Sequence, residues 1–132
     1  MQNSFSTDTV IFVGYVTCDQ KPIDGRAEMF ECDWGRDSLI DPDDKLASVP
    51  IFKFMYGYFH LKGIQVEKPT LEPYLIIQTN CTWVNHTGCK ETFRKNVRSV
   101  VEWQFRVVDF MVIDICTDES DPIDGPCPTQ EY

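Results

Sequence analysis

Residues 57–63 read GYFHLKG and residues 72–81 read EPYLIIQTNC, and these two stretches decide the expected fold. In both, the side chains alternate with the two-residue period of a β-strand, and glycine or proline stands at the boundaries. The second stretch ends on Cys81, which lies inside a cluster of glycosylation signals. This combination predicts a small, secreted, all-β domain that binds a partner rather than catalysing a reaction.

The same alternation marks further strands on both sides of these stretches. Residues 10–18, 26–31 and 97–116 are rich in aromatic and β-branched residues, which favour a pleated sheet. Residues 97–116 fit either one long bulged strand or two strands joined by a tight turn near Val108 and Asp109. No window shows helical periodicity, so about seven or eight short strands separated by turn residues predict a two-sheet β-sandwich.

The chain has 132 residues, a length typical of one domain. We expect a flexible lead-in over residues 1–9, the sandwich over residues 10–116, with loops at 41–46 and 65–73, and an acidic, proline-rich tail over residues 117–132.

The formal net charge is −9, and the lysines and arginines are scattered. Nucleic acid and anionic lipid are therefore disfavoured as partners, because phosphate binding needs a concentrated basic surface. No apolar run approaches the length of a membrane span.

The chain has six cysteines, and no pair has the Cys-x-x-Cys spacing of a zinc ribbon or a redox site. An even number in a short chain indicates disulfides and an oxidising compartment, although about 15 complete pairings are possible. Cys81 with Cys89 is the favoured bridge, because it closes a short connection. Cys18 with Cys116, both at predicted strand ends, is the second. Alternatively, Cys18 or Cys32 is a buried thiol.

Two Asn-x-Thr sequons begin at Asn80 and Asn85 and agree with a secretory route. Asn85 is the favoured acceptor, because early cross-linking of Cys81 would hinder transfer to Asn80. Residues 1–8 are polar and lack the apolar segment of a signal peptide. We interpret the sequence as a mature secreted chain with an added initiator methionine. The rival interpretation is a cytosolic protein with free thiols.

Five motifs follow one another along the chain. They read VGYVTCDQKP at 13–22, AEMFECD at 27–33, DPDDKL at 41–46, GYFHLKG at 57–63, and EPYLII at 72–77 followed by Cys81 and Cys89. Through these motifs, the segment from Val10 to about Cys116 resembles the nematode transthyretin-like family. The resemblance implies a transthyretin-like (prealbumin-type) sandwich, secretion, and a role as an extracellular binding protein.

Several features depart from the pattern of that family. Asp-Gly-Arg at 24–26 replaces the usual apolar start of the second strand, and residues 34–40 resemble an insertion. Cys32 and Cys127 are additional to the usual four cysteines, and we expect them to pair with each other. These departures suggest a divergent member with its own partner, and Trp34, in a predicted loop, is the predicted partner contact.

The resemblance also raises an enzymatic alternative, because the transthyretin fold hosts 5-hydroxyisourate hydrolases. Those enzymes use a constellation of His and Arg and end in a Tyr-Arg-Gly-Ser-like tail. This chain has only His60 and His86, and its last residues, 129–132, read TQEY. General acid–base catalysis needs positioned titratable groups, so no catalytic residue and no cofactor are predicted.

Acidic and aromatic clusters each have two interpretations. Carboxylates of the loop and of the tail offer oxygen ligands for Ca²⁺, but they lack EF-hand spacing and are interpreted as solvated, so no metal site is predicted. The residues concerned are Asp41, Asp43 and Asp44 in the loop and Asp118, Glu119, Asp121 and Asp124 in the tail.

The aromatic residues of 52–59 are interpreted as sandwich core, whereas an exposed member would mark a contact patch.

The sequence therefore predicts a secreted, disulfide-linked, glycosylated β-sandwich that recognises an extracellular protein or a cell-surface partner. A carrier of a small apolar ligand or lipid is the alternative, as transthyretin is by resemblance. A hydrolase is the weakest alternative.

Overall fold

The computed structural model describes residues 7–32, 44–66, 70–71, 73–81, 88–97, 100–101 and 105–123. Its strands, in chain order, are β1 (Thr7–Cys18), β2 (Lys21–Pro22), β3 (Gly25–Glu31), β4 (Asp44–Ile51), β5 (Tyr58–Val66), β6 (Thr70–Leu71), β7 (Pro73–Thr79), β8 (Thr92–Asn96), β9 (Val100–Val101) and β10 (Phe105–Asp114). A 3₁₀ turn, η1 (Lys53–Met55), lies between β4 and β5. Within these residues no helix is long and apolar enough to cross a membrane.

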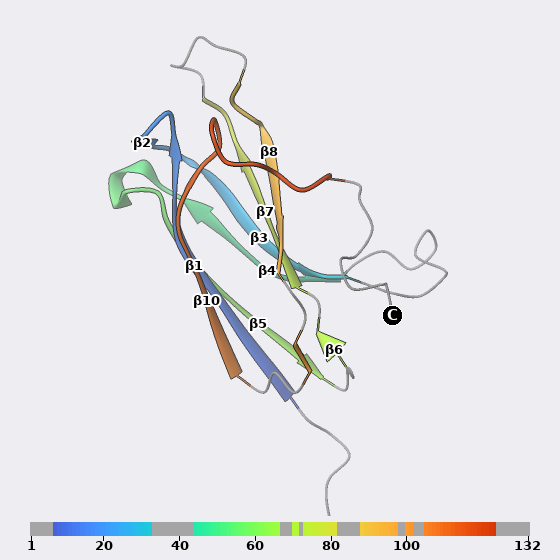
Figure 1. Cartoon of the computed structure of the whole chain (residues 1–132). Coiled ribbons are helices and arrows are strands. Elements are labelled where there is room, and N and C mark those ends of the chain that lie inside the picture. The colour runs from blue at the N-terminus through green and yellow to red at the C-terminus, as the bar shows by residue number, and fades with distance from the viewer. Residues whose placement is uncertain are drawn as a thin grey trace, which may run out of the picture.

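The main strands form two four-stranded sheets, which are the layers visible in Figure 1. In the first sheet β1 is central: β10 pairs with one edge in parallel, and β5 and β2 pair with the other edge in antiparallel fashion. The second sheet has the order β4-β3-β7-β8, and β6 and β9 form a separate two-stranded ladder. This arrangement confirms the predicted all-β, two-sheet sandwich.

Alternate side chains of the strands fill the space between the sheets. In β1, for example, Val10, Phe12 and Val16 are fully buried, whereas Tyr15 is exposed. Each large apolar side chain that is buried in this way stabilises the fold by about 1.5–3 kcal/mol. The largest fully buried side chains are Phe12, Phe59, Phe93, Ile23, Met29, Ile51, Leu61, Leu75, Ile77 and Ile115.

The structure matches neither interpretation of residues 97–116 in full, because two strands, β9 and β10, lie there and β10 begins only at Phe105. β10 continues through Val108 and Asp109 as one strand, and a β-bulge interrupts its register with β1. Val13 lies opposite Asp109 and Tyr15 lies opposite Val112, so two residues of β10 face one residue of β1. β10 is therefore a single bulged strand with no turn at Val108–Asp109.

Three strand boundaries differ from the sequence-based expectation. β1 begins at Thr7, inside the predicted lead-in, because Thr7 pairs with Val66 at the far end of β5. That end of β5 lies in the second predicted loop. β4 begins at Asp44, inside the predicted acidic loop, because Asp44 pairs with Glu31. Backbone pairing does not require apolar side chains, so polar strand ends leave no periodic signal in the sequence.

The described part of the predicted tail lies along β8. The backbone N–H of Asp121 donates to the carbonyl oxygen of Arg94 at 2.8 Å, and the N–H of Arg94 donates to Ser120 Oγ at 2.9 Å. The N–H of Asn96 donates to Asp121 Oδ2 at 2.7 Å. The first residues of the tail therefore satisfy the outer edge of the second sheet, a role that its acidic, proline-rich composition does not reveal.

Asp114 is a buried carboxylate that joins the end of β10 to the turn between β1 and β2. Its Oδ2 accepts hydrogen bonds from Thr17 Oγ1 at 2.8 Å and from the Gln20 N–H at 2.6 Å. Its Oδ1 accepts from the N–H groups of Cys116 at 2.9 Å and Asp19 at 3.3 Å. Burial alone would raise the pKa of Asp114, but these four hydrogen bonds favour the charged form and hold the pKa below its ordinary value of 3.8.

The Asp114→Asn variant is expected to lose about 2–3 kcal/mol of unfolding free energy at neutral pH, because an amide cannot accept as many of these bonds. The lowered folded-state pKa means that the wild-type advantage is complete above pH 3.8 and is lost as the pH falls through the folded-state value. Denaturant unfolding of the wild type and of Asp114→Asn, at neutral pH and well below pH 3.8, measures this advantage. If the difference in unfolding free energy between the two proteins is the same at both pH values, the prediction is contradicted.

Candidate functional site

Six large apolar or aromatic side chains are exposed around η1 and the adjoining ends of β1 and β5. We call these residues the aromatic patch: Tyr15, Phe52, Phe54, Met55, Tyr56 and Tyr58. The side chains of Phe54 and Tyr56 project furthest, with 75% and 73% of their surface exposed. Exposed apolar surface of this kind is typical of interaction sites, and aromatic rings contribute large contact areas there.

A tight turn projects the patch from the sandwich. The N–H of Met55 donates to the carbonyl oxygen of Phe52 at 3.0 Å, and the N–H of Tyr56 donates to that of Lys53 at 2.9 Å. The N–H of Lys53 donates to Asp24 Oδ1 at 2.8 Å, which ties the turn to the connection between β2 and β3. No residue of η1 is buried, so the turn presents its side chains to solvent.

Gly57 holds the base of this turn against β1. It adopts a φ of +74°, a conformation that glycine accepts without strain. Its N–H donates to the carbonyl oxygen of Phe52 at 3.0 Å, and its own carbonyl oxygen accepts from the N–H of Val16 at 2.9 Å. The position of the patch relative to the first sheet is therefore fixed by backbone contacts.

An exposed apolar row continues the patch across the outer face of the first sheet. Tyr15 on β1 lies opposite Tyr58 on β5, and their ring centroids are 5.3 Å apart. On its other side Tyr15 lies opposite Val112 of β10, which is also exposed. Cross-strand neighbours share a face, so the three side chains form one surface.

The interpretation of residues 52–59 as sandwich core is wrong for most of their aromatic members. Phe59 is buried, with 1% of its surface exposed. β4 ends at Ile51, and the chain then leaves the second sheet through η1. Phe52, Phe54, Tyr56 and Tyr58 are exposed instead, and they stay candidates for a contact patch.

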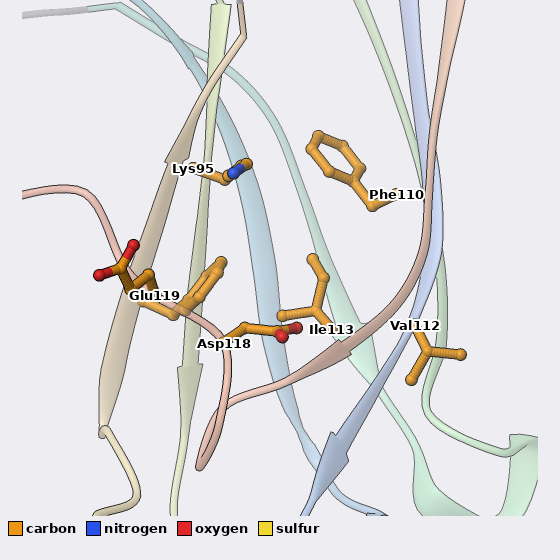
Figure 2. Close-up of a pocket in the computed structure, with 7 residues that line it drawn as sticks. Lys95, Phe110, Val112, Ile113, Asp118 and Glu119 are labelled. Carbon is orange, nitrogen blue, oxygen red and sulfur yellow. The ribbon is translucent and has the colours of Figure 1, made fainter.

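A second candidate site is a pocket of about 280 Å³ between β8 and the second half of β10. Figure 2 shows Lys95 on the β8 side and Phe110 on the β10 side of this space. Apolar and charged groups both line the pocket, and an amphipathic molecule would match that lining. The lining residues are Phe93, Lys95, Phe110, Val112, Ile113, Asp118 and Glu119.

Two disulfides join cysteines that both lie in the described part of the chain, Cys18–Cys81 and Cys89–Cys116. The predicted bridges Cys81–Cys89 and Cys18–Cys116 use the same four residues, but their pairing is wrong. The argument from a short loop considers only separation along the chain. In the sandwich, stacking of the sheets brings Cys18 at the end of β1 to Cys81 just after β7.

Cys32 is also disulfide-bonded. The alternative in which Cys18 or Cys32 is a buried thiol is therefore wrong, and the described residues contain no free cysteine. Pairing of Cys32 with Cys127 stays a prediction, because Cys127 lies outside the described residues.

The four sulfur atoms of the two bridges form one compact group, which we call the cysteine cluster: Cys18, Cys81, Cys89 and Cys116. All four lie within 4.8 Å of one another. Between the bridges, Cys18 Sγ is 3.5 Å from Cys116 Sγ and 4.0 Å from Cys89 Sγ. Sequence reasoning missed this convergence, because the four residues come from four separate segments and carry no local motif.

Of the other predicted site residues, Asn80 and His60 lie in the described part of the chain. Asn80 is exposed directly after β7, whereas Asn85 and Trp34 lie outside the described residues. His60 is exposed on β5 and does not line the pocket, and His86 again lies outside the described part of the chain. The glycosylation and Trp34 hypotheses therefore stay predictions.

Two acidic groups of the tail, Asp118 and Asp121, accept backbone hydrogen bonds within the described residues. Asp118 Oδ2 accepts from the N–H of Asp114 at 2.9 Å, and Asp121 Oδ2 accepts from the N–H of Asn96. Asp41, Asp43 and Asp124 lie outside the described ranges. Where the structure is described, the cysteine cluster is the group of three or more possible metal ligands that converges on one point.

The fold and its bridges define a class, the disulfide-linked two-sheet β-sandwiches of the transthyretin-like type. Transthyretin-like protein 2 of Caenorhabditis elegans is 33% identical to this chain over 94 residues, which cover 69% of this chain and 61% of that protein. This similarity supports the resemblance of the chain to the nematode transthyretin-like family. It spans less than two thirds of the length of this curated relative.

Comparisons with protein-family models and with solved structures do not bear on the function. A scan against protein-family models finds no match. Among solved structures, a 9R-lipoxygenase from Cyanothece aligns with 83% of this chain and 16% of its own, with 15% identity and a TM-score of 0.37. A likeness of that degree bears on neither fold nor function.

Proposed function

We propose that the protein is a secreted, non-catalytic binding protein that recognises an extracellular protein or a cell-surface partner through the aromatic patch. The observation that carries this proposal is the exposure of the patch on a turn that hydrogen bonds hold against the sandwich. A rigid base lowers the entropy cost of binding, since little ordering remains when a partner docks.

The chemistry of the surface favours a protein partner. Tyrosine and phenylalanine rings with few polar neighbours form the centres of protein interfaces, where a few such residues supply most of the binding energy. Lys53 is the charged residue within η1, and the whole chain carries a net charge of −9. An anionic membrane or a nucleic acid therefore matches this surface less well than a protein does.

Secretion and glycosylation are part of the proposal. The disulfides agree with an oxidising compartment, and Asn85 stays the favoured acceptor, because Cys81 within the Asn80 sequon is cross-linked to Cys18. The cytosolic alternative required free thiols, and the described cysteines have none.

The double variant Phe54→Ala with Tyr56→Ala is expected to weaken partner binding by about 30-fold or more, because the two side chains together contribute about 2 kcal/mol or more to an interface that they anchor. The oxidised protein, produced in a secretory host, is immobilised and titrated with a detergent extract of nematode surface membranes. A photo-crosslinking amino acid at position 54 identifies the captured protein by mass spectrometry.

Phe105→Ala is the matched control for this test. Phe105 is an aromatic residue with 62% of its surface exposed, and it lies at the opposite end of β10 from Val112. Capture should persist in the control and be lost in the patch variant. If the patch variant captures the same protein with the same affinity, the proposal is overturned, and binding of protein-free anionic vesicles would identify a membrane partner instead.

A second candidate function, carriage of a small amphipathic ligand, is favoured by the pocket between β8 and β10. Its volume of about 280 Å³ is close to the lower end of the range of ligand sites. Lys95→Trp would fill the mouth of the pocket and is expected to abolish binding of the apolar probe N-phenyl-1-naphthylamine, measured by its fluorescence. Equal probe binding by this variant would exclude the pocket, and the Phe54→Ala variant serves as the control.

A further inference from the structure

We infer that the cysteine cluster becomes a tetrathiolate site for one Zn²⁺ ion when its two disulfides are reduced. The inference is independent of the proposed binding function. It rests on the convergence of the four sulfur atoms, which the fold brings together from the ends of four strands.

The geometry of the cluster matches the requirement of the ion. Zinc binds thiolate sulfur at about 2.3 Å in a tetrahedral arrangement, which places the sulfur atoms about 3.8 Å apart. The non-bonded sulfur distances of 3.5 Å from Cys18 to Cys116 and 4.0 Å from Cys18 to Cys89 lie on either side of that value. No pair in the cluster exceeds 4.8 Å, so the ligands need only small side-chain rotations after the bonds open.

The backbone that carries the cluster is held by interactions other than the disulfides. The N–H of Ile115 donates to the carbonyl oxygen of Thr17 at 3.0 Å, which joins the segments of Cys18 and Cys116. The N–H of Lys90 donates to the carbonyl oxygen of Ile115 at 3.1 Å, which joins the segments of Cys89 and Cys116. The N–H of Thr79 donates to the carbonyl oxygen of Glu91 at 3.0 Å, which joins the segments of Cys81 and Cys89. Where these strands stay folded, the four positions therefore stay close together without the covalent links.

The electrostatic surroundings include a cation beside the cluster. Lys90, which directly follows Cys89 in the chain, donates from Nζ to the carbonyl oxygen of Ile115 at 3.5 Å, and Ile115 directly precedes Cys116. A positive charge near cysteine favours the thiolate, which is the form that binds zinc. Asp114 is a negative group near the cluster, and its four hydrogen bonds stabilise its charged form.

A dithiol can act as the reductant of the two disulfides. Each disulfide accepts two electrons and two protons from one dithiol, which closes into its own cyclic disulfide. Zn²⁺ then displaces four protons from the four thiols and forms a complex with a net charge of two minus. Partial burial of the cluster limits access by water, and its ligands span both sheets.

The test uses Co²⁺ as a spectroscopic substitute for Zn²⁺. The full chain is reduced anaerobically with dithiothreitol, desalted and titrated with CoCl₂. Binding of a single ion per chain, with the visible ligand-field bands of a tetrahedral tetrathiolate, is expected, and these bands should disappear when Zn²⁺ is added. The oxidised protein should show no bands. Circular dichroism of the reduced chain reports whether the strands persist.

Variants locate the site. Cys81→Ser is expected to lose the tetrathiolate spectrum, whereas Cys32→Ser, outside the cluster, should retain it. Zinc should also raise the midpoint of thermal unfolding of the reduced wild type but not that of reduced Cys81→Ser. The inference is overturned if the reduced chain, folded or unfolded, binds Co²⁺ only with octahedral spectra. It is equally overturned if Cys32→Ser and Cys81→Ser behave alike.

Discussion

Replacement of Gly57 by alanine is expected to destabilise the folded protein by about 3–5 kcal/mol, the sum of a left-handed backbone penalty and an overpacking penalty. Gly57 has a φ of +74°, and an added Cβ would collide with the carbonyl oxygen of Val16. The collision is with backbone in the central strand of the first sheet, so no side-chain rotation relieves it. Strand β1 or the turn would have to move.

Denaturant unfolding of Gly57→Ala and wild type measures this difference. Tyr56→Ala is the matched control: Tyr56 also has a positive φ of 64°, but its side chain is exposed, and removing it should change stability by about 0.5 kcal/mol or less. A loss below about 1 kcal/mol in Gly57→Ala would show that the contact between Gly57 and Val16 is not rigid. Because this contact positions the patch, partner capture should weaken as well.

Removal of the Cys18–Cys81 bridge by the double variant Cys18→Ala with Cys81→Ala is expected to cost about 4 kcal/mol. The two residues are 63 positions apart, and a bridge across a loop of that length removes much of the entropy of the unfolded chain. The corresponding removal of Cys89–Cys116, across 27 positions, should cost slightly less, about 3.5 kcal/mol.

Unfolding of both double variants under oxidising conditions gives this comparison. Peptide mapping without reduction provides the independent control on pairing, and it should recover peptides that link Cys18 to Cys81 and Cys89 to Cys116. A peptide in which Cys81 is joined to Cys89 would contradict the pairing in the structure. A loss of less than about 1 kcal/mol in the Cys18 and Cys81 variant would contradict the entropic estimate.

The strands were predictable where one side of the chain is buried, because burial imposes a two-residue period on the sequence. Phe59 and Leu61 show this period in β5, and both are buried. The aromatic residues just before them could not be assigned from composition, because phenylalanine and tyrosine serve equally in cores and at interfaces. The end of β4 at Ile51 and the positive φ of Tyr56 separate the two cases, and these are backbone properties.

The cysteine pairing was not predictable from the sequence for a similar reason. The rule that favours short loops predicts a bridge between Cys81 and Cys89. In the structure Cys81 is bonded to Cys18, which is far away in the chain. Stacking of two sheets determines which strand ends meet, and no local pattern encodes that contact. The same stacking creates the cysteine cluster and the pocket between β8 and β10.

The parallel pairing of β1 with β10 has a consequence for how the chain matures. Thr17 and Asp114, which hydrogen-bond to each other across this pair, are 97 residues apart in the sequence. During vectorial synthesis β1 emerges long before its partner, so one of its edges stays open until translation has passed Asp114. Contacts between such distant residues are slow to form, which gives folding times in the millisecond-to-second range. Completion of the first sheet is therefore a late event, and oxidation of Cys18 with Cys81 can precede that of Cys89 with Cys116 in the newly made chain.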